Sequence, residues 1–181
     1  MTALRDTLRR LLGGDGLPDG FGGRLEPDER VLATARTVDG GQLVVTSWGL
    51  WLPDADGARR LGWHLVSKAT WKNGALAVVE AVEVEEIAAG DGPAAVLLAD
   101  RPARRFRLTD PGRLPEAVHA RVEGSIRSRH RRELPGGGAW FVQRKISGRD
   151  GTVLQVRPDP GTDPGMVAQV ASDVVRSLGR A

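Results

Sequence analysis

Hydrophobic and polar positions alternate with a period of two along most of the chain, and this pattern is typical of half-buried β-strands. The apolar runs are short and are separated by clusters of Gly, Pro, Asp and Asn, which favour tight turns. Asn73-Gly74 between two such runs is a strong signal for a two-residue hairpin. We expect an antiparallel meander in which the last two strands form a hairpin. The expected strands are residues 31–37, 42–46, 49–53, 58–61, 67–72, 75–80 with an extension to 87, 94–98 and 103–108.

Three segments show helical spacing instead. Residues 2–12 place four leucines on one face and charged side chains on the rest, which predicts a short amphipathic helix. Asp110-Pro111 is a typical helix start, and the ridge Leu114, Val118, Val122 and Ile126 follows it at i, i+4 spacing. Asp163-Pro164 opens a final helix, and residues 139–146 and 152–156 form a hairpin before it. Residues 129–133 are interpreted as an extended segment or, alternatively, as a solvated linker.

The order of these elements predicts a mainly β protein with α-helices, of the α+β class. An antiparallel barrel of about seven strands closed by a helix fits the order best, with a strand-strand-helix extension behind it and a short helix in front. We expect three parts: an N-terminal helix and connector over residues 1–22, the barrel with its closing helix over 23–128, and the extension over 129–181. A chain of 181 residues is long enough for one domain with a sizeable core.

Composition excludes several kinds of chemistry. The chain has no Cys and no Tyr, so disulfides, zinc thiolate sites and thiol nucleophiles are excluded. Its three histidines, His64, His119 and His130, do not have the spacing of metal ligands. Glu80, Glu83, Glu85 and Glu86 are interpreted as a solvated strand face rather than an acid-base pair. No nucleophile elbow or phosphate-binding loop is present, and we expect neither an enzyme nor a cofactor or metal.

Charge is distributed unevenly along the sequence. The net charge is only +3, yet residues 101–145 hold 12 cations and 4 anions, a net +8, while the remainder carries 14 cations and 19 anions, a net −5. The basic stretch predicts an anion-binding or partner-binding patch. Its candidate residues are Arg104, Arg105 and Arg107 on a strand, and Arg127, Arg129, Arg131 and Arg132 where the chain leaves a helix. The negative end of that helix dipole is an alternative reason for the second group.

Two short motifs carry a resemblance to a known family. The run Leu25-Glu26-Pro27-Asp28-Glu29-Arg30-Val31-Leu32, followed by Leu43-Val44-Val45-Thr46 and Gly49-Leu50, resembles the opening of bacterial pleckstrin-homology-like and GRAM-like domains. Residues 59–66 with Ala69-Thr70-Trp71 resemble a group of uncharacterised actinobacterial proteins. The resemblance implies a pleckstrin-homology-like barrel and no particular activity. The first hairpin lacks the basic cluster of lipid-reading members, so inositol-phosphate binding is not implied.

The sequence therefore predicts a non-catalytic binding or scaffolding module that acts through protein contacts or self-association. Trp48 in a predicted turn is a further candidate contact. One alternative is peripheral binding to anionic membrane lipid through the N-terminal helix and the Arg-rich segment. Weak nucleic-acid binding is another, although few aromatic side chains lie among the cations. No apolar stretch is long enough for a spanning helix or a signal peptide, so we expect a cytoplasmic protein, with the inner membrane face as an alternative location.

Overall fold

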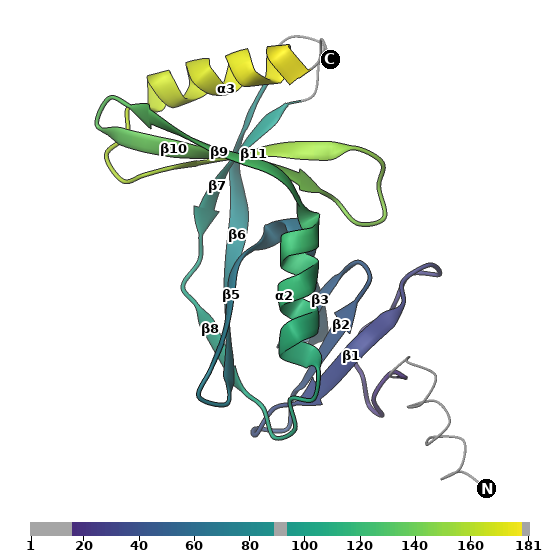
Figure 1. The fold of residues 1–181 in the computed structure, drawn as a ribbon. Helices are drawn as coiled ribbons and strands as arrows, with labels where there is room; N and C mark the ends of the chain where they lie inside the picture. The colour runs from purple at the N-terminus through teal and green to yellow at the C-terminus, as the bar shows by residue number, and fades with distance from the viewer. Residues whose placement is uncertain (1–15, 89–93, 179–181) are drawn as a thin grey trace, which may run out of the picture. The chain divides into compact units, whose positions relative to one another are not determined.

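The computed structural model describes residues 16–88 and 94–178, and the expected helix over residues 2–12 lies outside these ranges. The described residues form a mainly β structure with two α-helices, which confirms the α+β class. Figure 1 shows the elements in chain order. The strands and helices are β1 (Val31–Arg36), β2 (Gln42–Thr46), β3 (Gly49–Asp54), β4 (Gly57–Gly62), β5 (Val66–Lys72), β6 (Ala75–Ile87), β7 (Ala95–Asp100), β8 (Arg104–Arg107), α2 (Leu114–Ser125), β9 (Ile126–Leu134), β10 (Gly137–Lys145), β11 (Thr152–Pro158) and α3 (Pro164–Leu178).

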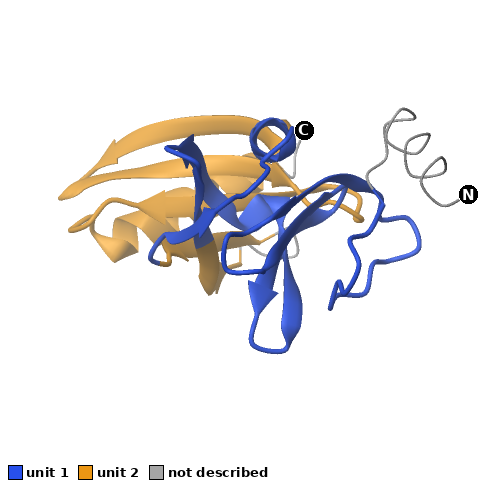
Figure 2. Ribbon diagram, turned by 90° about the horizontal axis from the view of Figure 1, so that it is seen from below, with its two compact units in different colours: residues 1–80, 102–123 blue, residues 81–101, 124–181 orange. Residues whose placement is uncertain are grey.

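The chain divides into two compact units, coloured separately in Figure 2. Unit 1 comprises residues 1–80 and 102–123, and unit 2 comprises residues 81–101 and 124–181. The contacts group residues 81–101 with the C-terminal segment, whereas the sequence analysis assigned them to the barrel. The expected domain boundaries at residues 22 and 128 stay a prediction.

In unit 1, the first four strands form an antiparallel sheet in the order β1-β2-β3-β4, at the positions that the alternation predicted. β5 and the first half of β6 form the predicted hairpin. Asn73 and Gly74 have φ angles of 52° and 72°, and this left-handed pair produces a turn whose twist matches the strands. β5 and β6 follow the predicted ranges because alternation and turn residues are local signals.

The expected last hairpin is wrong, because β7 and β8 do not pair with each other. Both pair with β6 in an antiparallel sense, β8 against residues 75–78 and β7 against residues 81–87. β6 is 13 residues long and therefore offers room for two partners in succession. Local spacing predicted both strands, but the partner of each was decided by the length of β6.

The core of unit 1 contains the inward positions of these strands and one face of α2. Leu114, Val118 and Val122 of α2 are buried against Leu43, Val45 and other strand residues. This confirms the predicted i, i+4 ridge up to Val122. The helix begins at Leu114 rather than at Asp110, and Ile126, the expected fourth ridge residue, is the first residue of β9.

Unit 2 is a sheet with one helix on it. The second half of β6 leads to β7, β11, β10 and β9 in that order. β7 and β11 pair in parallel, and the other neighbours pair in an antiparallel sense. Val167, Ala171 and Val175 of α3 are buried against one sheet face that includes Phe141 and Val156. Figure 1 shows α3 lying over this face.

The C-terminal extension differs from the expected strand-strand-helix in having three strands before the helix. The third strand is β9, which follows the end of α2 directly and contains Arg127, Arg129, Arg131 and Arg132, so that these residues are extended and do not form a linker. β9 forms because β10 offers a partner along nearly its whole length, from Leu134 against Gly137 to Ile126 against Arg144. Pairing between strands outweighs the weak strand preference of an Arg-rich segment. Of the helices in the described ranges, none is long and apolar enough to cross a membrane.

Candidate functional site

β9 presents four of the seven candidate arginines along one edge of the unit 2 sheet. It pairs with β10 on one side, and no other described strand pairs with it. Most of its residues are exposed, including all four arginines. Backbone N–H and C=O groups on the free side of an edge strand are available to a partner strand. β9 therefore combines a basic side-chain row with a strand edge.

The charges of β9 are only partly neutralised. Arg131 donates to Glu133 Oε1 at 3.0 Å and to Asp159 Oδ2 at 2.7 Å. The hydrogen bond to Asp159 is the main cause of a raised pKa at Arg131, and the same bond lowers the pKa of Asp159. Arg127, Arg129 and Arg132 form no ion pair with any residue in the described ranges. Three cations of β9 are thus free to meet an external anion.

One aromatic ring lies beside these cations. Trp140 on β10 faces Arg131 across the strand pair and is 40% exposed. The Arg131 guanidinium carbon is 5.9 Å from the centre of the indole ring, a cation–π contact. Arg131 thus contacts a ring and two carboxylates, whereas Arg127, Arg129 and Arg132 form no ion pair with a described residue.

The other predicted arginines lie on β8 in unit 1. Arg104 donates to the carbonyl oxygen of Pro53 at 2.8 Å. Its guanidinium carbon is 5.1 Å from the centre of the Phe106 ring. Arg105 and Arg107 are exposed and form no ion pair with a described residue. The structure brings the β8 group together within unit 1 and the β9 group within unit 2, and the single patch expected from the sequence stays a prediction.

Trp48 lies in the β2–β3 turn, as predicted, and is partly buried. Its ring contacts the Arg60 guanidinium, whose carbon is 5.3 Å from the ring centre, and Trp51 contacts the same group at 5.6 Å. Arg60 also forms an ion pair with the fully buried carboxylate of Glu29. Trp48 is therefore held by its own chain rather than extended toward solvent.

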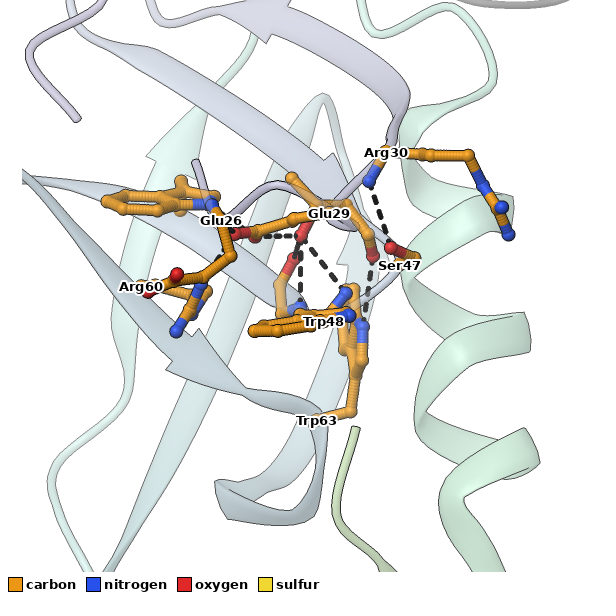
Figure 3. Close-up of polar contacts among 10 residues, drawn as sticks. Glu26, Glu29, Arg30, Ser47, Trp48, Arg60 and Trp63 are labelled. Atoms are coloured by element: carbon orange, nitrogen blue, oxygen red, sulfur yellow. Dashed lines mark hydrogen bonds and ion pairs between the residues drawn. The ribbon is translucent and has the colours of Figure 1, made fainter. Parts of the chain in front are cut away.

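The Glu29 carboxylate is the centre of a polar network that sequence analysis did not identify (Figure 3). The Thr46 hydroxyl and the Trp51 indole N–H donate to Oε1 at 2.5 and 2.9 Å. Arg60 and the Glu26 backbone N–H donate to Oε2. Burial alone would raise the pKa of Glu29, but these hydrogen bonds and the Arg60 charge together lower it. The only signal in the sequence was its place in the Glu-Arg-Val-Leu run.

A second missed feature is the other edge of the unit 2 sheet. Glu83, Glu85 and Glu86 on β6 are exposed, as expected for solvated residues, and they lie on a strand edge. Glu80 differs from the expectation, because it is only partly exposed and forms an ion pair with Arg59 at 2.8 Å. In the sequence, this edge is indicated by three glutamates that follow the part of β6 paired with β5. Within the described ranges, no three His, Asp or Glu side chains are grouped so that they could hold a metal ion.

Comparison of the chain with models of known protein families, with curated proteins and with solved structures gives no match.

Proposed function

We propose that this chain is a non-catalytic protein-binding module that takes an acidic, extended segment of its partner along β9. The observation that supports this most directly is the open edge of β9 with three arginines, Arg127, Arg129 and Arg132, that no described carboxylate neutralises. A partner strand gains backbone hydrogen bonds from the edge, and its alternate side chains meet the cations.

A protein segment fits β9 better than a membrane or a nucleic acid. Lipid headgroups and phosphates would use the charges but not the regularly spaced backbone groups of the edge. Binding of single-stranded nucleic acid relies on exposed aromatic rings that stack on bases. β9 and β10 offer Trp140 for this purpose, and the Arg131 guanidinium already lies over that ring.

For unit 1 we propose a pleckstrin-homology-like arrangement. Its support is the order of elements: seven strands, β1 to β5, the first half of β6, and β8, followed by α2. β1–β4 form one sheet, and β5, β6 and β8 form the other sheet of this unit. An experimental structure with another strand order in unit 1 would contradict this assignment, which carries no activity with it.

The test of the proposed function is binding of a labelled peptide that alternates glutamate with valine, followed by fluorescence anisotropy. We expect binding that weakens as salt rises, because the attraction is between exposed charges. The variant Arg129→Glu with Arg132→Glu should weaken binding at least about tenfold, since two attractive charges become repulsive.

The matched control is Arg105→Glu with Arg107→Glu on β8, which changes the net charge by the same amount and should leave peptide binding nearly unchanged. A peptide methylated at alternate backbone nitrogens should bind more weakly if β9 adds it as a strand. Equal loss in both double variants would refute a role specific to β9. Tighter binding of anionic vesicles or single-stranded RNA through Arg129 and Arg132 would favour an alternative.

A further inference from the structure

The sheet of unit 2 has two edges of opposite charge. One edge is β9, and the other is the second half of β6, because β5 pairs with β6 only up to Glu80. β8 pairs with residues 75–78 of β6 on the side opposite to β5. Beyond these positions, no described strand pairs with the outer side of β6. Within unit 2, the strand order β6-β7-β11-β10-β9 thus ends at β9 on one side and at the second half of β6 on the other, while the first half of β6 pairs with β5.

The charges on these two edges are equal and opposite. Residues 81–87 of β6 contain three glutamates and no cation, a net −3. β9 contains four arginines and one glutamate, a net +3. Glu83, Glu85 and Glu86 are exposed, as are the arginines of β9. Each edge therefore presents the charge that the other edge would attract.

The strand directions are also compatible. β6 is antiparallel to β7, β7 is parallel to β11, and two further antiparallel steps lead to β9. β9 consequently runs opposite to β6. If a second copy continues the sheet with the same face upward, its β6 lies antiparallel beside β9 of the first copy.

Two rows of paired residues cross the whole sheet and match acid to base. In one row, Glu86 faces Val96, then Gln155, Val142 and finally Arg129. In the adjacent row, Glu85 faces Leu97, then Val156, Phe141 and finally His130. When the rows continue into a second copy, Glu86 meets Arg129, and Glu85 meets His130 with Arg132 diagonal to it.

The same charges oppose symmetric pairing of like edges. Two β9 strands side by side would place arginines against arginines, and two β6 edges would place glutamates against glutamates, which is destabilising. A two-fold dimer through either edge is therefore disfavoured. The remaining arrangement is heterologous, head to tail, and its copies form a ring or an open chain.

We propose that the acidic partner of β9 is the second half of β6 in another copy of this chain, so that the protein assembles head to tail by continuing the unit 2 sheet. This inference rests on the proposed function, since it names the acidic segment that β9 takes. β-bulges at both edges, at Val84 on β6 and at Arg127 on β9, limit the ladder to a few residues. The contact is accordingly weak and reversible.

The test is sedimentation velocity of the full chain over a range of concentrations, with two charge-reversal variants. Arg129→Glu with Arg132→Glu gives a chain with two acidic edges, and Glu85→Arg with Glu86→Arg gives a chain with two basic edges. We expect the wild type to show concentration-dependent association that high salt suppresses. Each variant alone should associate at least about tenfold more weakly, and a mixture of the two should recover association, because unlike edges meet again.

The β8 variant Arg105→Glu with Arg107→Glu is the control and should associate like the wild type. A mixture that stays monomeric while the wild type associates would overturn the proposed pairing, as would association of each variant alone at wild-type strength.

The Glu85→Arg/Glu86→Arg variant also separates the two proposals, because its β9 is intact. If the wild type stays monomeric and this variant still binds the acidic peptide, head-to-tail assembly fails and the proposed function stands. If it does not bind the peptide, the proposed function fails as well.

Discussion

At the scale of single residues, Glu29 carries the largest local consequence. Its carboxylate is withdrawn from water but receives four hydrogen bonds, from Thr46, Trp51, Arg60 and the Glu26 backbone. A buried charge is tolerated only when it is paired and hydrogen-bonded in this way. The network joins the segment before β1 to β2, β3 and β4, and thereby holds the start of the first sheet in place.

Replacing this carboxylate should destabilise the fold. We expect Glu29→Gln to lower the free energy of unfolding by about 1–3 kcal/mol at neutral pH, because Arg60 loses its ion pair and an amide nitrogen faces a donor. Urea unfolding followed by tryptophan fluorescence measures the change. Glu26→Gln is the control, since Glu26 is exposed and contributes its backbone N–H to the network.

The same comparison should depend on pH. The pKa of Glu29 is lowered from 4.5 in the folded chain, where hydrogen bonds and Arg60 outweigh the effect of burial. A carboxyl group with a lowered pKa stabilises the fold above its unfolded pKa, and this contribution is lost as pH falls through the folded pKa. The stability gap between the wild type and Glu29→Gln should therefore be full at neutral pH and shrink progressively below 4.5. A gap that stays constant into strong acid would argue against an ionised Glu29.

The sequence could not have placed Glu29 in a buried network. Its partners Thr46, Trp51 and Arg60 are 17, 22 and 31 positions away. A glutamate just before a strand is normally exposed, and only the meeting of three chain segments buries it. Trp48 shows the converse: its turn was predicted, but its contact with Arg60 depends on β4.

At the scale of elements, the positions of the strands and helices follow local sequence patterns, whereas the pairing partners of the strands do not. β9 shows this most clearly, since its Arg-rich sequence has neither a strong apolar alternation nor a turn on its N-terminal side. It begins where α2 ends, at Ser125 and Ile126, and is held as a strand by pairing with β10. Propensity is a weak guide where a neighbouring strand supplies the hydrogen bonds.

Two glycines that flank β9 should respond to alanine in opposite ways. A Cβ at Gly124, in α2, would meet no heavy atom within 4 Å, so Gly124→Ala should stabilise the fold by about 0.5 kcal/mol through lower entropy of the unfolded chain. Gly136, in the β9–β10 turn, has φ +83°, and a Cβ there would be 2.3 Å from the Gly161 carbonyl oxygen. Gly136→Ala should cost more than about 1 kcal/mol. Thermal unfolding of both variants tests the pair, and equal shifts of the same sign would contradict it.

At the scale of the whole molecule, the chain has two separate hydrophobic cores, one in each unit. Each core consists mainly of aliphatic side chains with few aromatics, in keeping with an aromatic content of 4%. Part of the uneven charge along the sequence lies on the two edges of the unit 2 sheet, one of which is basic and the other acidic.

The first core should be sensitive to loss of volume. Leu43 is fully buried in unit 1, and Leu43→Ala should lower the free energy of unfolding by about 2–5 kcal/mol, because it removes buried methyl groups and leaves a cavity. Leu17, which is 48% exposed, provides the control, and Leu17→Ala should change the free energy of unfolding by less than about 0.5 kcal/mol. Chemical denaturation measures both, and similar costs would contradict the assignment of the core.

The ranges of β1 to β6, the ridge of α2 and the start of α3 can be predicted from local patterns, because alternation, helical spacing and turn residues act between near neighbours. The pairing of the strands, in contrast, was set by the tertiary structure. It set β11 parallel to β7, made β9 a strand, buried Glu29, and left a basic and an acidic edge on one sheet. Each of these depends on contacts between residues far apart in the chain, and no local pattern specifies such contacts.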